Sequence, residues 1–337
     1  RKDLKSPIRV LIMVKSSKPI SKKENHEIND LIFKELLKRG YSLEGNTRIW
    51  NLADSKLWYI TPEQAQAFLN LEKSKDYQQD VIQKEIDLID KNINELTADM
   101  KDKPLNIVDL GCGDGKKAVI FMSYLKDTTK LRYCPIDISS YMVEKAIEKM
   151  SKVNIKEIVK LQWNISDFEN LENITPLLRY GEYKDNLILL LGNTLGNFEI
   201  HELLYEIRSA MKDGDLLLIG NGLDNRNPSE IIKAYKHTQI DNWLVKILTQ
   251  IGLKRENLEY GVRFRNSRVE EYYTLTKDTE ISFLGRTVRF NEGDQIITAV
   301  SYKYDKDDFM SFMKMYFSKV DLFVSKDGSY ALALCKK

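Results

Sequence analysis

The chain has 337 residues, of which 42% are hydrophobic and 30% are charged, a composition typical of an ordered globular protein. Its 52 Lys and Arg residues nearly balance its 50 Asp and Glu residues, so the overall charge favours neither nucleic acid nor a membrane surface as a partner. This length is enough for one large domain or for two domains that share a core.

The cysteines and histidines argue against two common kinds of site. They lie scattered along the chain, at Cys112, Cys134, Cys335, His26, His201 and His237. Their spacing suits neither a disulfide framework nor a zinc site, so we expect no bound metal. No apolar run approaches the ~20 residues of a membrane helix, and no signal peptide is recognised. We therefore expect a cytoplasmic protein, and because the chain does not start with Met we expect a few residues to precede Arg1.

Before residue 101 the hydrophobic pattern predicts mainly helices. A short buried strand is expected over 9–14, and a helix over 25–39 that ends at Gly40. The pattern from 61 to about 100 is helical again, with Pro62 suited to a first turn. The first 23 residues carry an excess of Lys and Arg, which we interpret as a solvated basic edge, with a nucleic-acid-binding arm as the alternative.

From residue 105 strands and helices alternate. Strands are predicted at 105–110, 132–136, 158–163, 186–191 and 215–219, and helices at 115–125, 140–150 and 200–211. This alternation predicts a doubly wound α/β fold with a mostly parallel sheet. Further along, the pattern predicts helices at 228–252 and 309–317, an antiparallel insertion at 260–304, and a terminal hairpin of strands 320–324 and 330–334.

A glycine-rich turn between the first predicted strand of this series and its helix is the strongest candidate for a ligand site. Residues 107–115 read Ile-Val-Asp-Leu-Gly-Cys-Gly-Asp-Gly, so that Gly111, Cys112, Gly113 and Gly115 follow Asp109. Such a turn lets the backbone approach a ligand without a Cβ clash. The spacing differs from the Gly-x-Gly-x-x-Gly of dinucleotide folds. An acidic edge suits the cationic S-adenosylmethionine better than a diphosphate, and a structural turn without a ligand is the alternative.

Two further segments fall where such folds contact a nucleoside. Asp137 ends the second strand, where a carboxylate can bind ribose hydroxyls, and Ser139 and Ser140 are available to cap the next helix in its place. Asp167 and Phe168 follow the third strand, where an acidic residue and an aromatic ring can hold adenine.

The loop after the fourth strand carries a family resemblance. Residues 190–198 read Leu-Leu-Gly-Asn-Thr-Leu-Gly-Asn-Phe, without the Pro-Pro-aromatic motif of DNA amino-methyltransferases. The segment resembles the Gly-Ser-Thr-Ile-Gly-Asn-Phe loop of the histidine-specific α-N-methyltransferases of the ergothioneine pathway. Further similar positions are Lys117, 167–169, 234–235, 290–304 and 327–334, so the resemblance covers most of the chain from Asn106 onward.

The resemblance implies a class I methyltransferase fold, with a mostly parallel seven-stranded sheet, a terminal antiparallel hairpin and a second, substrate-capping domain. We expect the cofactor-binding core at 71–225 and 301–337, and the cap at 1–70 and 226–300. The cofactor implied is S-adenosylmethionine. The residues expected to bind it are Asp109, Gly111, Cys112, Gly113, Gly115, Lys117, Asp137, Asp167, Phe168, Gly192 and Asn193.

The resemblance also implies roles in substrate binding and catalysis. Asn197 and Tyr235 would hold the α-amino and carboxylate groups of an amino acid, and Ser301 would face its side chain. Without the resemblance, Asn197 reads as a loop-capping amide and Tyr235 as a half-buried helix aromatic.

Two positions depart from the family. Ala299 replaces a glutamate that reads the substrate side chain, so an imidazole would lose a partner and histidine is disfavoured as the substrate. Trp50 stands, by rough alignment, where the family has a pocket tyrosine, and an indole cannot act as a base.

The function that we expect is N-methylation of the α-amino group of an amino acid or a close derivative. The proton of the amine would pass to water, to Tyr235 or to a carboxylate. Candidates in the insertion are Glu270, Glu271 and Tyr272, with a charged face on a solvated strand as the alternative. We expect a small-molecule partner and no membrane. The other readings are a methyltransferase for protein or nucleic acid, and a non-catalytic S-adenosylmethionine-binding protein.

Overall fold

The computed structural model describes residues 22–75, 82–153, 155, 157–160, 168–224 and 227–337. The strand predicted at 9–14, the basic N-terminal segment and Asp167 lie outside the described residues. None of the helices within these ranges combines the length and the apolar character needed to cross a membrane.

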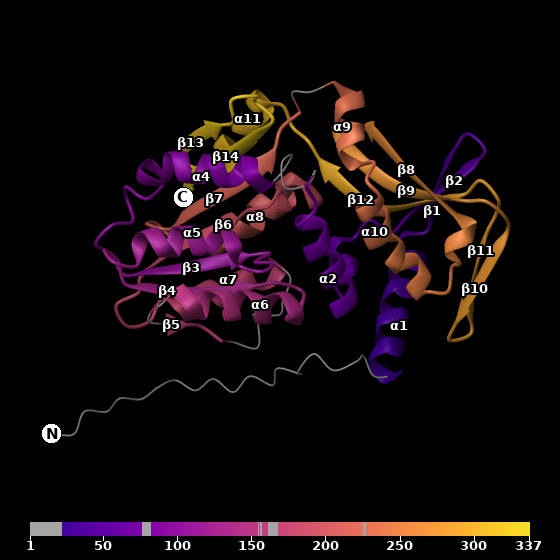
Figure 1. Ribbon diagram of the computed structural model, residues 1–337, viewed down its shortest axis with the longest axis horizontal. Coiled ribbons are helices and arrows are strands. Elements are labelled where there is room, and N and C mark those ends of the chain that lie inside the picture. The colour runs from indigo at the N-terminus through magenta and orange to yellow at the C-terminus, as the bar shows by residue number, and fades with distance from the viewer. Residues whose placement is uncertain (1–21, 76–81, 154, 156, 161–167, 225–226) are drawn as a thin grey trace.

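A seven-stranded sheet forms one side of the molecule (Figure 1). Its strand order is β13-β14-β7-β6-β3-β4-β5. The strands are β3 (Leu105–Leu110), β4 (Leu131–Ile136), β5 (Glu157–Ile158), β6 (Asp185–Leu190), β7 (Leu216–Gly222), β13 (Lys319–Val324) and β14 (Tyr330–Lys336). Strands β3 to β7 pair in parallel, whereas β14 pairs antiparallel with β7 and with β13. The expected class I methyltransferase sheet with its terminal hairpin is therefore confirmed.

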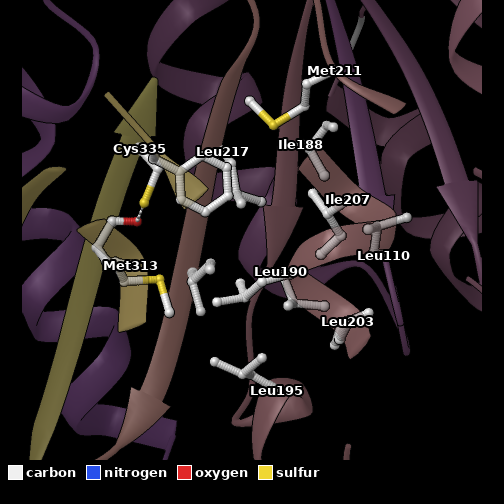
Figure 2. Close-up of a cluster of buried hydrophobic side chains, with 14 of the residues drawn as sticks. Leu110, Ile188, Leu190, Leu195, Leu203, Ile207, Met211, Leu217, Met313 and Cys335 are labelled. Atoms are coloured by element: carbon white, nitrogen blue, oxygen red, sulfur yellow. Dashed lines mark hydrogen bonds between the residues drawn. The ribbon is translucent and has the colours of Figure 1, made fainter. Parts of the chain in front are cut away.

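Helices cover both faces of this sheet because successive strand residues point to opposite sides. One face packs against α7 (Leu171–Leu178), α8 (Ile200–Ala210) and α11 (Lys306–Tyr316). The opposite face packs against α4 (Gln83–Leu96), α5 (Lys116–Leu125) and α6 (Ser140–Met150). In β3, Leu110 belongs to the first cluster and Ile107 to the second. Figure 2 shows Leu110, Leu190 and Leu217 of the sheet in one cluster with Leu203 and Ile207 of α8.

A second sheet, of five strands, lies on the other side of the molecule (Figure 1). Its order is β1-β2-β12-β9-β8, and the strands are β1 (Tyr41–Glu44), β2 (Thr47–Asn51), β8 (Leu258–Arg265), β9 (Arg268–Leu275) and β12 (Gln295–Tyr302). Strands β10 (Thr279–Phe283) and β11 (Arg286–Phe290) form a separate hairpin. The antiparallel insertion is confirmed for β8, β9 and β12. The sequence reading missed β1 and β2, and β2 pairs in parallel with β12.

The second sheet packs against helices from two separate parts of the chain. These are α1 (Lys22–Arg39), α2 (Pro62–Glu72), α9 (Pro228–Tyr235) and α10 (Thr238–Gln250). Leu36, Leu71 and Leu244 share one apolar cluster with residues of β9 and β12. In α2 the predicted first turn is confirmed, because Pro62 is the first residue of the helix and lies between Thr61 and Gln64, which form a reciprocal capping box. The division into domains at 70, 225 and 300 stays a prediction.

Other elements also differ from the predictions, and the helical pattern expected from 61 to about 100 includes two separate helices, α2 and α4. The helix predicted over 228–252 is two helices, since the Tyr260 hydroxyl donates to the Tyr235 carbonyl at 3.0 Å and satisfies the end of α9. Helix α7 was not predicted, because Pro176 lies within it and proline is disfavoured inside helices. Strand β5 is shorter than predicted within the described residues.

Candidate functional site

The glycine-rich turn connects β3 to α5 at the carboxyl end of the parallel strands. Gly113 has φ 50°, and a Cβ built there would meet nothing within 4 Å, so the backbone borders open space. Gly111 lies beside Thr194, and both Gly111 and Gly113 line a large pocket. Gly115 does not line it, because a Cβ at Gly115 would meet Ala146 at 3.1 Å. Gly115 therefore allows close packing of α5 on α6.

Two buried carboxyl groups border this turn. Asp109 accepts a hydrogen bond from the Tyr133 hydroxyl at 2.7 Å. Asp137 accepts from the backbone N–H of Gly113 at 3.1 Å and from that of Ser139 at 2.9 Å. Burial raises the pKa of Asp109 to about 7 and that of Asp137 to about 6. Ser139 is the N-cap residue of α6, but its side chain makes no capping bond, contrary to the reading from sequence.

The turn after β6 is held by a buried ion pair that the sequence reading missed. Glu85 of α4 accepts from the Gly192 backbone N–H at 2.9 Å and pairs with Lys117 Nζ at 2.5 Å. The Tyr330 hydroxyl also donates to Glu85. Lys117 lines the pocket, but its ammonium group is already ion-paired with Glu85. The sequence contains one signal for this buried ion pair, because Glu85 lies on the same helix face as Leu88, where an apolar residue is expected.

Side chains from both sheets meet across the pocket at Ser301. Its Oγ receives hydrogen bonds from Lys303 Nζ at 2.6 Å, from Asn193 Nδ2 at 3.0 Å and from the Tyr235 hydroxyl at 3.1 Å. Lys303 is buried, and its Nζ lies 5.5 Å from the centre of the Tyr235 ring. Asn197 ends the short 3-10 helix η6 (Thr194–Asn197) and lines the same pocket. The cluster thus joins the loop after β6 to α9 and β12.

An aromatic wall completes the pocket on the side of α2 and α10. Trp243 lies 5.0 Å from Phe68, 5.5 Å from Tyr59 and 5.6 Å from Trp58 between ring centroids. Trp58 belongs to the 3-10 helix η1 (Ser55–Trp58). The sequence reading did not single out these residues, because they look like core aromatics until the fold brings them together.

Most of the predicted site residues line this single pocket. Those that do are Asp109, Gly111, Cys112, Gly113, Lys117, Asp137, Phe168, Gly192, Asn193, Asn197, Tyr235, Ala299 and Ser301. Phe168 packs against Phe198 with ring centroids 5.2 Å apart.

Trp50 is not brought to the pocket. Its Nε1 donates to Asp294 at 3.1 Å, and its ring packs against Phe290. Trp50 belongs instead to the apolar core of the second sheet, and Trp58 and Tyr59 are the aromatic residues of this region that line the pocket. The rough alignment failed here because this part of the chain offers no local motif.

Only one of the three candidates in the insertion lines the pocket. Glu271 does, whereas Glu270 is ion-paired with Arg263, Arg265 and Arg268. Neighbouring residues of a strand point to opposite faces, so Glu270 and Glu271 cannot share one environment. Neither lies on a solvated face, since both are buried.

The residues of the pocket fit S-adenosylmethionine. Open space next to Gly113 gives a ligand access to the backbone, as a bound nucleoside with an amino acid tail requires. Asp109 and Asp137 supply an acidic edge for a cationic ligand, and Phe168 supplies an aromatic face.

Comparison with known proteins identifies the family. A family model described as histidine-specific methyltransferase, SAM-dependent, matches residues 64–337. No curated protein matches the chain. Among solved structures, the PH0226 protein of Pyrococcus horikoshii OT3 is similar, with a TM-score of 0.44 and 13% identity over 81% of this chain and 98% of that chain.

Two further solved structures are similar to this chain. CalS10 of Micromonospora echinaspora, an amino pentose methyltransferase, has a TM-score of 0.37 and 8% identity over 80% of this chain and 95% of its own. DesVI of Streptomyces venezuelae has a TM-score of 0.36 and 11% identity over 81% of this chain and 97% of its own. The family match extends from α2 to the last residue and includes both the glycine-rich turn and β12, so this chain belongs to the family of histidine-specific, S-adenosylmethionine-dependent methyltransferases.

Proposed function

We propose that this methyltransferase transfers a methyl group to the α-amino nitrogen of an amino acid or a close derivative. The observation that carries the proposal is the continuity of the pocket. One cavity runs from the glycine-rich turn at Gly111 and Gly113 to the hydrogen-bonded cluster of Tyr235 and Ser301. A cofactor bound at the turn and a small substrate bound at the cluster would therefore face each other.

The cofactor end of the pocket is assigned to the residues around the turn. In this proposal the backbone at 111–113 and the carboxyl groups of Asp109 and Asp137 hold S-adenosylmethionine, with Phe168 against its adenine. A cationic ligand favours the ionised form of a carboxyl group whose pKa burial has raised. When bound, the cofactor supplies an electrophilic methyl group.

The substrate end is assigned to polar groups that remain available to a ligand. The Tyr235 hydroxyl donates to Ser301, so the lone pairs of its oxygen stay available to accept from an amine. The amide of Asn197 can bind the α-carboxylate, and the buried ammonium of Lys303 adds positive charge to this region. Gly192 and Asn193 shape the loop between the two ends.

The chemical task of these residues is to hold a neutral amine in line with the methyl group. Positioning of this kind can supply a large part of the rate enhancement in a displacement with a good leaving group. The amine has to lose its proton before it attacks, and in this proposal the ammonium group releases that proton to solvent, while the Tyr235 oxygen accepts an N–H hydrogen bond from the neutral amine and orients it.

The test is a calorimetric screen of the twenty amino acids with S-adenosylhomocysteine present, followed by a methyl-transfer assay with any amino acid that binds. Mass spectrometry should place the new methyl group on the α-nitrogen. Asn197→Ala should abolish binding, whereas Asn94→Ala, an exposed residue of α4, should leave it unchanged. If S-adenosylhomocysteine binds and no amino acid does, the acceptor is a macromolecule or the protein acts without catalysis, and the proposal fails.

A further inference from the structure

Glu271 carries a buried carboxylate oxygen that has no protein partner. The side chain of this β9 residue lines the pocket and is 4% exposed. Among the buried side-chain atoms of the described residues, its Oε2 is one of the few without a hydrogen bond. A buried polar atom without a partner is destabilising, so its retention in a pocket wall points to a partner that arrives with the ligand.

The position of Glu271 indicates which part of a ligand it would meet. Glu271 is the Cα partner of Ala299 across the β9–β12 ladder, and both line the pocket. Ser301 also lines the pocket, two residues along the same strand. Since paired residues point to the same face, Glu271 and Ser301 belong to the wall formed by the second sheet, across the pocket from the glycine-rich turn.

Ala299 leaves space beside this carboxylate. Its side chain is a single methyl group, at the position where the resembled family has a side-chain-reading glutamate. The carboxylate missing from 299 is therefore present one strand away, at 271. The departure at Ala299 therefore does not leave this wall of the pocket without a carboxyl group.

We propose, resting on the α-amino-acid function above, that Glu271 selects amino acids whose side chain ends in a cationic nitrogen group. An ammonium, guanidinium or imidazolium group would donate to the unpartnered Oε2 and pair with its charge, in the space beside Ala299. Charge-assisted hydrogen bonds in a buried site are about twice as strong as neutral ones, so neutral side chains of the same shape would be rejected.

Electrostatics supports this assignment. Burial raises the pKa of Glu271 to about 8, against the opposing influence of Lys303. The carboxyl group is therefore mostly protonated near pH 7 without a ligand, and a cationic side chain would favour its ionised form. Binding of such a ligand should then release about one proton.

The experiment compares matched pairs of amino acids by calorimetry with S-adenosylhomocysteine present. The pairs are L-lysine with L-norleucine, L-arginine with L-citrulline, and L-histidine with L-phenylalanine. In the wild-type protein, at least one basic member should bind about tenfold or more tightly than its neutral match. Glu271→Gln should reduce this preference to within about threefold, while Glu259→Gln, which removes an exposed charge from β8 of the same sheet, should preserve it.

Proton release gives a second readout that a purely structural role would not change. Calorimetry at pH 7 in buffers of different ionisation enthalpy should show release of about one proton with the preferred ligand in the wild type, and none in Glu271→Gln. Equal binding of the basic and neutral members to the wild type overturns the inference without any variant. If neutral amino acids bind and are methylated, the proposed function stands and this inference fails. If no amino acid binds, the proposed function fails and this inference fails with it.

Discussion

Three buried carboxyl groups line the pocket, and burial raises the pKa of each of them. The values are about 6 for Asp137, about 7 for Asp109 and about 8 for Glu271. Asp109 and Asp137 already receive hydrogen bonds from the protein, whereas Glu271 Oε2 receives none. The first two therefore hold the turn as well as bordering the pocket, and the third is the most available to a ligand.

Asp137→Asn should weaken binding of S-adenosylhomocysteine about tenfold or more and lower the free energy of unfolding by about 1–3 kcal/mol. The asparagine amide keeps one acceptor oxygen, so it cannot accept from both Gly113 and Ser139 as the carboxylate does. Calorimetry and urea unfolding measure the two effects. Asp127→Asn, at an exposed position, is the control. An unchanged affinity would mean that Asp137 does not shape the turn for the cofactor.

Glu271→Gln should change how stability depends on pH. In the wild type the raised pKa makes the folded state hold a proton that the unfolded state releases above pH ~4.5, so stability falls as pH rises from about 5 to about 8. The variant lacks this loss, so its free energy of unfolding should rise relative to that of the wild type by about 1 kcal/mol for each pH unit in that window. Urea unfolding at pH 5, 6.5 and 8 measures the difference, and a constant offset would contradict the assignment. The ionisable neighbours Lys303, Tyr260 and Tyr273 are present in both proteins.

At the scale of elements, Glu85 links its own helix, α4, to three other segments that belong to or pack on the seven-stranded sheet. From α4 it reaches Lys117 on α5, the backbone of Gly192 after β6, and Tyr330 on β14. The turn after β6, which lines the pocket at Gly192, is therefore held in place by contacts from α4. A buried ion pair of this kind is strongly destabilising to break on one side only.

Gly192→Ala should lower the free energy of unfolding by about 2–3 kcal/mol. The residue has φ 77°, and a Cβ would lie 2.6 Å from Lys117 Nζ, so the variant combines backbone strain with displacement of the ion pair. Gly181→Ala is the matched control, because Gly181 has φ 66° and open space around its Cβ position. That control should cost only about 1 kcal/mol. Equal losses in the two variants would show that the ion pair does not depend on the turn.

At the scale of the whole molecule, the pocket is built by two sheets that have separate cores. Loops of the seven-stranded sheet contribute Gly111 and Gly192, the five-stranded sheet contributes Glu271 and Ser301, and α10 contributes Trp243. Neither sheet forms the site alone. When a ligand binds at one end of the pocket, the loops that face the pocket should therefore be the first parts of the chain to respond.

S-adenosylhomocysteine should slow amide hydrogen exchange at 111–115 and 192–197 by about tenfold or more. A ligand that binds only the closed, native loops lowers the population of their open forms. The β10–β11 hairpin serves as the internal control, because none of its residues lines the pocket. Mass spectrometry of peptic fragments measures both. Equal slowing in the hairpin would indicate global stabilisation and would contradict binding at the turn.

Much of the fold was determined by the sequence alone, because its signals are local. Residues 105–110 and 140–150 coincide with β3 and α6, since strand and helix periodicity depend on neighbours along the chain. The glycine-rich turn and the loop at 190–198 were recognisable for the same reason, because a tight turn needs particular residues at fixed spacing. The residues expected to bind the cofactor were identified from these local motifs, and those that the structure describes, apart from Gly115, line one pocket, whereas their contact with the cofactor stays a prediction.

What tertiary structure decided was which distant residues meet. The break between α9 and α10 depends on Tyr260, the anchor of the turn after β6 depends on Glu85, and the true neighbours of the pocket include Trp58 instead of Trp50. The carboxyl group of Glu271, at the proposed substrate end, could not be predicted from the sequence for the same reason. A single strand predicts only that Ala299 removed a carboxylate, whereas the register of β9 on β12 places Glu271 beside it. The register of β9 on β12 depends on which faces of the two strands are buried in the fold, so it cannot be read from either strand alone.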